Sequence, residues 1–163
     1  MTLAEVNALD KATFVARFGA LFEHSSWVVE NAAMLRPFDD LLDGLMSAVH
    51  RASTEQKLAL IRAHPELAGK AAIDGTLTDA SAAEQASAGL DRLTPAEYAR
   101  FHALNSAYKE RFGFPFIICV RLTDKAGILA AMERRLDNDR EVEIETALAQ
   151  IGEIIRLRLE DLA

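Results

Sequence analysis

The sequence lacks most of the features that mark specialised classes of protein. Its 163 residues include one cysteine, Cys119, which excludes an internal disulfide framework and a thiolate metal site. The 25 acidic residues outnumber the 18 basic ones, and no basic patch is present to neutralise phosphates, so we expect no nucleic-acid partner. No apolar run approaches the roughly 20 residues of a membrane-spanning helix, so we expect no membrane partner.

Targeting signals are also absent. The N-terminus has neither the basic stretch nor the apolar core of a signal peptide, and the last three residues are not a peroxisomal address. Together with the low cysteine content, this favours the cytoplasm. The length suits a single domain over residues 1–163, large enough to bury roughly 70% of the surface that its unfolded chain exposes.

What the sequence does contain is helical periodicity along almost its whole length. The apolar residues of most segments recur at helical spacing, and a capping residue precedes most of them. The exception is the aromatic and β-branched segment near 114–120, where Pro115 excludes a helix interior and an extended buried conformation is expected. We therefore predict an all-α fold, one compact domain of about eight or nine helices. Helix starts are expected at Asp10, Ser25 or Ser26, Pro37, Ser53, Ser81, Thr94, Asp124 and just after Asp137 to Asp139.

His64 is the first candidate for chemistry. Pro65 disfavours the α conformation of the residue before it, so His64 stands where a helix ends and a loop begins. An imidazole can donate or accept a proton near neutral pH. The alternative is a surface histidine that interacts with the negative end of a helix.

Ser81 and Glu84 form the second candidate. Glu84 can act as a base or orient a second group, and a helix N-terminus offers free N–H groups to an anion. The alternative is structural, because Ser81 and Glu84 have the spacing of a capping box.

Arg158 is the third candidate. It falls inside the apolar stripe of the last predicted helix, whereas Arg156 falls to its side. A buried arginine requires a partner and is well suited to a carboxylate. The alternative is an arginine at the edge of the stripe whose head reaches water. Two other polar residues have simpler interpretations: Asn105 as a buried amide that binds backbone groups, and Cys119 as a buried inert thiol.

Four blocks of the sequence, residues 64–70, 81–86, 112–118 and 156–159, together resemble the 2-oxo-4-hydroxy-4-carboxy-5-ureidoimidazoline (OHCU) decarboxylases. These blocks occur in the order found in that family, and the resemblance covers essentially the whole chain. It implies an all-helical carbon–carbon lyase that converts OHCU to (S)-allantoin, the last step of urate degradation to allantoin. It also implies that the enzyme needs no cofactor and no metal and is a homodimer.

The resemblance further implies roles for individual residues. His64 would be the catalytic proton donor, with Glu84 as its acidic catalytic partner and Arg158 as the cationic anchor of the substrate. The remaining substrate contacts would be Pro65, Ser81, Ala82, Ala83, Glu84, Gln85, Phe116, Ile117, Ile118, Cys119 and Val120.

Two rival functions use the same residues. A helical module could bind an allantoin-like ureido ligand without turning it over. A metal-dependent hydrolase could use His64 and Glu66 as ligands, although their spacing is not a recognised zinc motif.

Overall fold

A computed structural model describes residues 1–69 and 75–163 of the chain. This part contains nine α-helices, two short 3₁₀ helices and no strand, which confirms the all-α prediction. The chain groups into two compact units, residues 1–63 with 152–163 and residues 64–151. The single domain over 1–163 stays a prediction. No helix among the described residues is both long and apolar enough to span a membrane.

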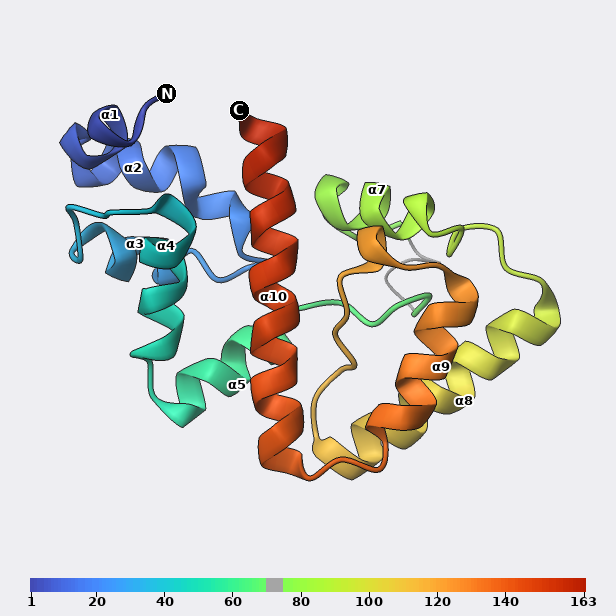
Figure 1. The fold of residues 1–163 in the computed structure, drawn as a ribbon. Helices are drawn as coiled ribbons and strands as arrows, with labels where there is room; N and C mark the ends of the chain where they lie inside the picture. Colours follow the sequence, from blue (N-terminus) through green and yellow to red (C-terminus); the bar gives the residue numbers. More distant parts are fainter. Residues whose placement is uncertain (70–74) are drawn as a thin grey trace. The chain divides into compact units, whose positions relative to one another are not determined.

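The first unit is built from short helices around an aromatic core. Its elements are α1 (Leu3–Ala8), α2 (Lys11–Phe18), η1 (Gly19–Leu21), α3 (Trp27–Ala33), α4 (Leu41–His50), α5 (Thr54–Arg62) and the end of α10 (Arg140–Leu162) (Figure 1). Helix α3 packs against both α2 and α4. The ring of Phe14 lies 5.1 Å from that of Phe18 and 6.0 Å from that of Phe38, so three apolar positions of the sequence meet in one cluster.

The prediction of a helix start at Pro37 is wrong. Helix α4 begins at Leu41, and the side chain of Asp40 caps it by accepting a hydrogen bond from the Asp43 N–H. Phe38 stays outside the helix because the Asn7 side chain binds both its N–H, at 2.8 Å, and its carbonyl, at 3.0 Å. The apolar pattern correctly marked Phe38 as buried but could not show that a distant amide holds its backbone.

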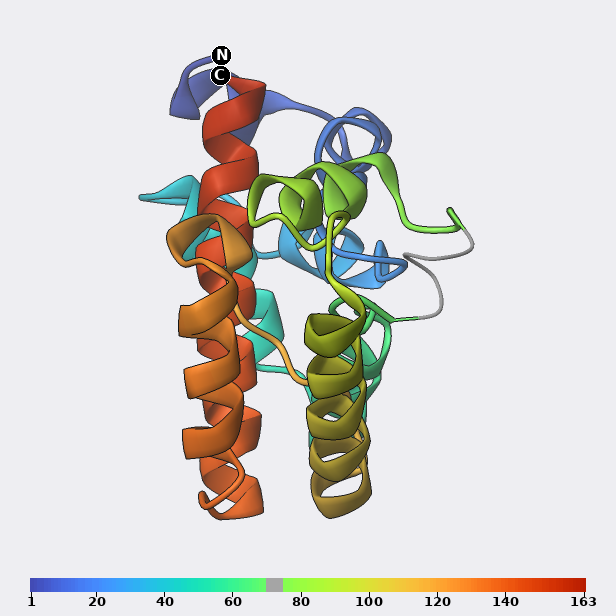
Figure 2. The ribbon, with the colours of Figure 1, turned by 90° about the vertical axis from the view of Figure 1, so that its right-hand side faces the viewer.

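The second unit carries most of the predicted site residues. It contains α7 (Asp79–Ser87), α8 (Pro95–Phe112), η2 (Val120–Leu122), α9 (Lys125–Arg135) and α10 as far as Ile151. Helices α8 and α9 pack against each other, and α7 packs against η2 (Figures 1 and 2). Residues 114–119 form neither helix nor strand, as predicted for the extended segment, and Val120 begins η2.

Aromatic side chains form the core of this unit where α8 ends and the extended segment begins. The Tyr108 ring lies 4.6 Å from the Phe112 ring, 5.9 Å from Phe114 and 5.2 Å from Phe116. Gly113 ends α8 with a positive φ of 79°, a conformation that glycine adopts without steric cost. The turn at Gly113 therefore brings Phe114 and Phe116 back onto the helix that precedes them.

The start of α8 generates a prediction about stability and pH. Thr94 and Glu97 form the predicted capping box. The hydrogen bond from the Thr94 N–H, with a smaller contribution from Lys125, lowers the pKa of Glu97 below its ordinary 4.5. A carboxyl whose pKa is lower in the folded state stabilises the fold above its unfolded pKa and loses that effect as the pH falls through the folded pKa.

We therefore expect Glu97→Gln to unfold at a lower temperature than wild type at pH 7, with a difference that shrinks as the pH falls below the ordinary pKa of 4.5 and through the lowered pKa of the folded state. Thermal unfolding followed by circular dichroism at several pH values measures this. Glu110→Gln, an exposed change near the other end of α8, is the control and should show no such pH-dependent loss. An equal difference at pH 7 and pH 3 would contradict the assigned role of the charge.

Candidate functional site

His64 lies in a buried position directly after α5. The helix ends at Arg62 with Ala63 as its C-cap, which agrees with the stop predicted from Pro65. His64 is 7% exposed, whereas His24, His50 and His102 are all exposed. The alternative of a surface histidine is therefore wrong.

The loop that follows His64 is held by two amide side chains. Gln85 Oε1 accepts a hydrogen bond from the Ala68 N–H at 3.0 Å, and Gln85 Nε2 donates to the Glu66 carbonyl at 3.3 Å. Asn105 Nδ2 donates to the Leu67 carbonyl at 2.8 Å, so Asn105 is the buried amide binding a backbone group that the sequence predicted. Ala68 has a positive φ of 52°, a conformation that costs energy for alanine and persists where the surroundings fix it.

The capping box predicted at Ser81 and Glu84 is wrong. Helix α7 begins at Asp79, and Thr78 is its N-cap, accepting a hydrogen bond from the Ser81 N–H. Ser81 is thus the third residue of the helix and is buried, while Glu84 stands half-buried in the middle of the helix. Glu84 therefore does not close a capping box at the start of α7.

Residues 116–120 are fixed at two points in the second unit. The Ile117 carbonyl accepts a hydrogen bond from Arg135 Nη1 at 2.7 Å, and the Cys119 N–H donates to Gln150 Oε1 at 2.9 Å. Ile118 lies between these anchors and is the one residue of the five that is not fully buried. Among the described residues, no hydrogen bond is made by its N–H or its carbonyl. Ile118 thus presents a donor and an acceptor that a ligand could use.

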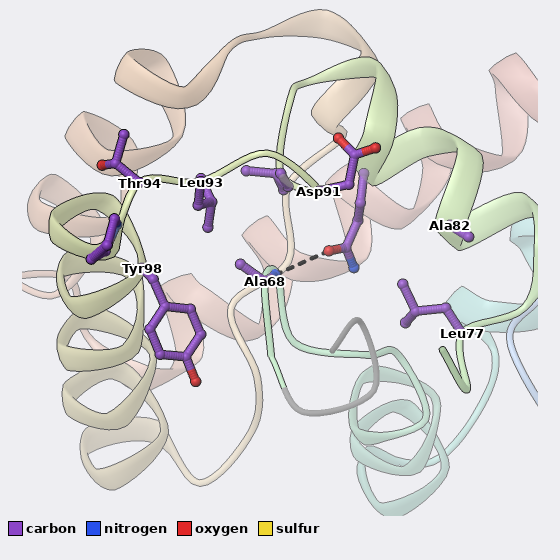
Figure 3. Close-up of a pocket in the computed structure, with 10 residues that line it drawn as sticks. Ala68, Leu77, Ala82, Asp91, Leu93, Thr94 and Tyr98 are labelled. Atoms are coloured by element: carbon purple, nitrogen blue, oxygen red, sulfur yellow. Dashed lines mark hydrogen bonds between the residues drawn. The ribbon is translucent and has the colours of Figure 1, made fainter. Parts of the chain in front are cut away.

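A cavity of about 520 Å³ lies beside the loop and α7 (Figure 3). Of the predicted substrate contacts, Ala82 and Gln85 line it; His64, Pro65, Ser81, Ala83, Glu84 and residues 116–120 do not. Tyr98, near the start of α8, is 40% exposed and forms part of its wall. The cavity therefore shares one helix and the Ala68 loop with the predicted site, and the rest of its wall comes from Leu77 and from residues between 90 and 98.

Arg158 is a buried, paired arginine in the first unit. Its Nη2 donates to Glu23 Oε1 at 2.9 Å, and its Nη1 donates to the Leu21 carbonyl at 2.9 Å. Both side chains are almost completely buried, which excludes the alternative of a snorkelling head. Arg156 is partly exposed and pairs with Glu153 and Glu160 on its own helix, so the difference predicted between these two arginines is confirmed.

Sequence reasoning missed three polar residues that form buried ion pairs in the structure. Glu23 comes from a segment without periodicity, and no local pattern could have identified it. Arg135 and Glu143 could have been found, because each falls in the apolar stripe of its helix as Arg158 does. The described residues contain no group of three or more His, Cys, Asp or Glu side chains arranged to hold a metal ion.

The two hydrogen bonds by which Gln85 holds the loop after His64, here called the Gln85 clamp, generate a first prediction for the site. Replacing Gln85 by alanine removes two hydrogen bonds and leaves the Ala68 N–H and the Glu66 carbonyl without the amide that binds them. We expect a loss of about 1–3 kcal/mol in the free energy of unfolding, measured by urea denaturation. Asn31→Ala, which removes an exposed amide from α3, is the matched control. A Gln85→Ala loss no larger than the control would contradict the clamp.

The buried ion pair generates a second prediction. Arg158→Leu leaves the Glu23 carboxylate buried without its guanidinium, so we expect a loss of about 3–5 kcal/mol in unfolding free energy. Arg156→Leu removes a partly exposed arginine and should cost at most about 1 kcal/mol. The double variant Glu23→Leu with Arg158→Leu should recover much of the stability, because no charge is then left unpaired. Equal losses for the two arginines in urea denaturation would refute the assignment.

Comparison with known proteins identifies the family. The OHCU decarboxylase family profile matches residues 7–160. The chain is 46% identical to the 2-oxo-4-hydroxy-4-carboxy-5-ureidoimidazoline decarboxylase of Haloferax volcanii, with 99% of this chain and 95% of the relative covered. It is 38% identical to the enzyme of that name from Mus musculus, with 99% and 93% covered.

A solved structure agrees with these matches. The crystal structure of (S)-allantoin synthase superposes with a TM-score of 0.74 at 30% identity, over 99% of this chain and 54% of that one. The chain therefore belongs to the OHCU decarboxylase family.

Proposed function

We propose that this protein decarboxylates OHCU to (S)-allantoin, the last step of the route from urate to allantoin. The observation that carries the proposal is the match to the Haloferax volcanii decarboxylase, which extends over 99% of this chain and 95% of that enzyme. A match of this extent includes every block of the sequence that bears a predicted site residue.

The reaction is one that side chains and backbone groups can promote. Cleavage of the bond to the carboxylate releases CO₂ and leaves an electron pair that the neighbouring carbonyl and imidazoline system delocalises. A proton is then added to one face of the ring carbon that becomes the stereocentre of allantoin. The protein must orient the scissile carboxylate, stabilise the enolate-like intermediate and deliver that single proton.

We assign the proton to His64 and the role of its catalytic partner to Glu84. The support for His64 is its burial at the end of α5 and the fixed loop that follows it. The support for Glu84 is its half-buried position inside α7, where it takes no part in capping. An acid–base group of this kind contributes about 10²–10⁴-fold to the rate.

The substrate offers a ureido group and ring amides, which need both donors and acceptors. The free N–H and carbonyl of Ile118 supply one of each, and Pro65, Ser81 to Gln85 and the other residues of 116–120 complete the predicted contacts. Arg158 as the cationic anchor follows from the resemblance. The homodimer is likewise a proposal from the resemblance, which sedimentation velocity tests, and the cytoplasmic location stays a prediction.

The activity is tested with OHCU made freshly by uricase and hydroxyisourate hydrolase. Circular dichroism should show (S)-allantoin forming faster, and with greater enantiomeric excess, than in buffer. Binding of substrate or allantoin without any rate effect would instead favour the non-catalytic ureido-binding module, and inactivation by chelators would favour the hydrolase.

The site assignment has its own test. We expect His64→Asn and Glu84→Gln each to reduce kcat by about 10²–10⁴-fold while retaining the helical circular dichroism of the wild type. His102→Asn, an exposed histidine on α8, is the control and should keep full activity. Full activity in His64→Asn would overturn the assignment of the proton donor and leave the proposed reaction standing.

A further inference from the structure

A carboxylate with no solvent exposure lies at the centre of a polar cluster in the second unit. Glu143, near the start of α10, is 0% exposed. It accepts hydrogen bonds from the Tyr108 hydroxyl at 2.5 Å, from Arg135 Nε at 2.8 Å and from Asn138 Nδ2 at 2.9 Å. A buried charge is tolerated only when it is paired and hydrogen-bonded, and these three donors meet that condition.

Arg135 extends this cluster to the extended segment. Its Nε binds Glu143 while its Nη1 donates to the Ile117 carbonyl at 2.7 Å. The guanidinium also lies 4.3 Å from the centre of the Phe116 ring, within the range of a cation–π attraction. One side chain therefore contacts two consecutive residues of the segment and is itself held by the carboxylate.

The hydrogen bond from Arg135 to the Ile117 carbonyl also fixes the peptide group of Ile118. The Ile117 carbonyl carbon is bonded to the Ile118 nitrogen, so the two atoms belong to one planar peptide group. Binding the Ile117 oxygen sets the direction in which the Ile118 N–H points. Gln150 performs the corresponding role on the other side by binding the Cys119 N–H, whose peptide group includes the Ile118 carbonyl.

We propose that Arg135, held by Glu143 and Tyr108, is a positioning residue that orients the Ile118 peptide groups toward the substrate. This inference rests on the proposed function and adds to it a residue that does not touch the substrate. A backbone group that binds substrate and transition state alike lowers KM with little effect on kcat. Loss of Arg135 should therefore raise KM, whereas loss of the proton donor lowers kcat.

The test compares Arg135→Met with Met132→Ala. Met132 is fully buried one turn earlier on α9, so its truncation weakens the same helix without removing the hydrogen bond to the Ile117 carbonyl. We expect Arg135→Met to raise KM for OHCU about tenfold, the effect of one lost hydrogen bond, with kcat within about threefold of wild type. Arg135→Lys should have a KM between those of the wild type and Arg135→Met. A lysine ammonium replaces a guanidinium that binds two partners in a fixed geometry. Met132→Ala should keep the wild-type KM.

A second measurement does not depend on activity. Hydrogen exchange of the backbone amides in residues 114–120 should be faster in Arg135→Met than in Met132→Ala at matched thermal stability. If Arg135→Met does not fold, Tyr108→Phe replaces it: this variant keeps the ring but removes the hydroxyl that binds Glu143. It should raise both KM and the exchange rate, by less than the loss of Arg135 would.

The outcomes separate the two proposals. A wild-type protein that makes no (S)-allantoin faster than buffer refutes the proposed function, whatever the exchange data show. An active wild type with an unchanged KM in Arg135→Met, or in Tyr108→Phe where the former does not fold, overturns the positioning role. An equal rise of KM in Met132→Ala also overturns it, because the effect would then come from general weakening of α9.

Discussion

A guanidinium is costly to bury unless acceptors inside the protein bind its N–H groups, and each of the two units buries an arginine that a carboxylate and a carbonyl bind, although Nη2 of Arg135 has no partner among the described residues. In the first unit Arg158 binds the Glu23 carboxylate and the Leu21 carbonyl. In the second unit Arg135 binds the Glu143 carboxylate and the Ile117 carbonyl. Each arginine stands in the apolar stripe of a long helix, and each joins that helix to a segment with little regular structure of its own.

This arrangement explains how a helical protein can hold irregular backbone in place. Residues 114–119 have no ladder of hydrogen bonds to fix them, so side chains must take that role. Arg135 and Gln150 bind the segment, just as Gln85 and Asn105 bind the loop after His64. Amide and guanidinium groups suit this role because they reach backbone groups from a rigid helix and present donors and acceptors in a fixed geometry.

The sequence predicted what depends on neighbours along the chain. Helical periodicity, the caps at Asp10, Ser53, Thr94 and Asp124, and the stop before Pro65 all involve residues within a few positions of one another. The burial of Arg158 was predictable for the same reason, since a helix fixes which residues share a face. Its partner was not, because Glu23 lies 135 residues away and nothing local marks it.

The two wrong helix starts have one cause. Pro37 and Ser81 are each acceptable first-turn or capping residues, but Asp40 and Thr78 also occur nearby and take that role. Local propensity does not decide between two adjacent caps that differ by a few tenths of a kcal/mol. Tertiary contacts decide it, as when Asn7 binds the Phe38 backbone and keeps it out of α4.

The shift of α7 also bears on the candidate chemistry. A glutamate that closes a capping box has its carboxylate bound to the backbone N–H of its own helix and is not available to a substrate. With the start at Asp79, Glu84 is the sixth residue of the helix and does not close a capping box. Gln85, the next residue of the same helix, binds the loop after His64. One helix therefore fixes the backbone that carries the histidine and presents the carboxylate proposed to act with it.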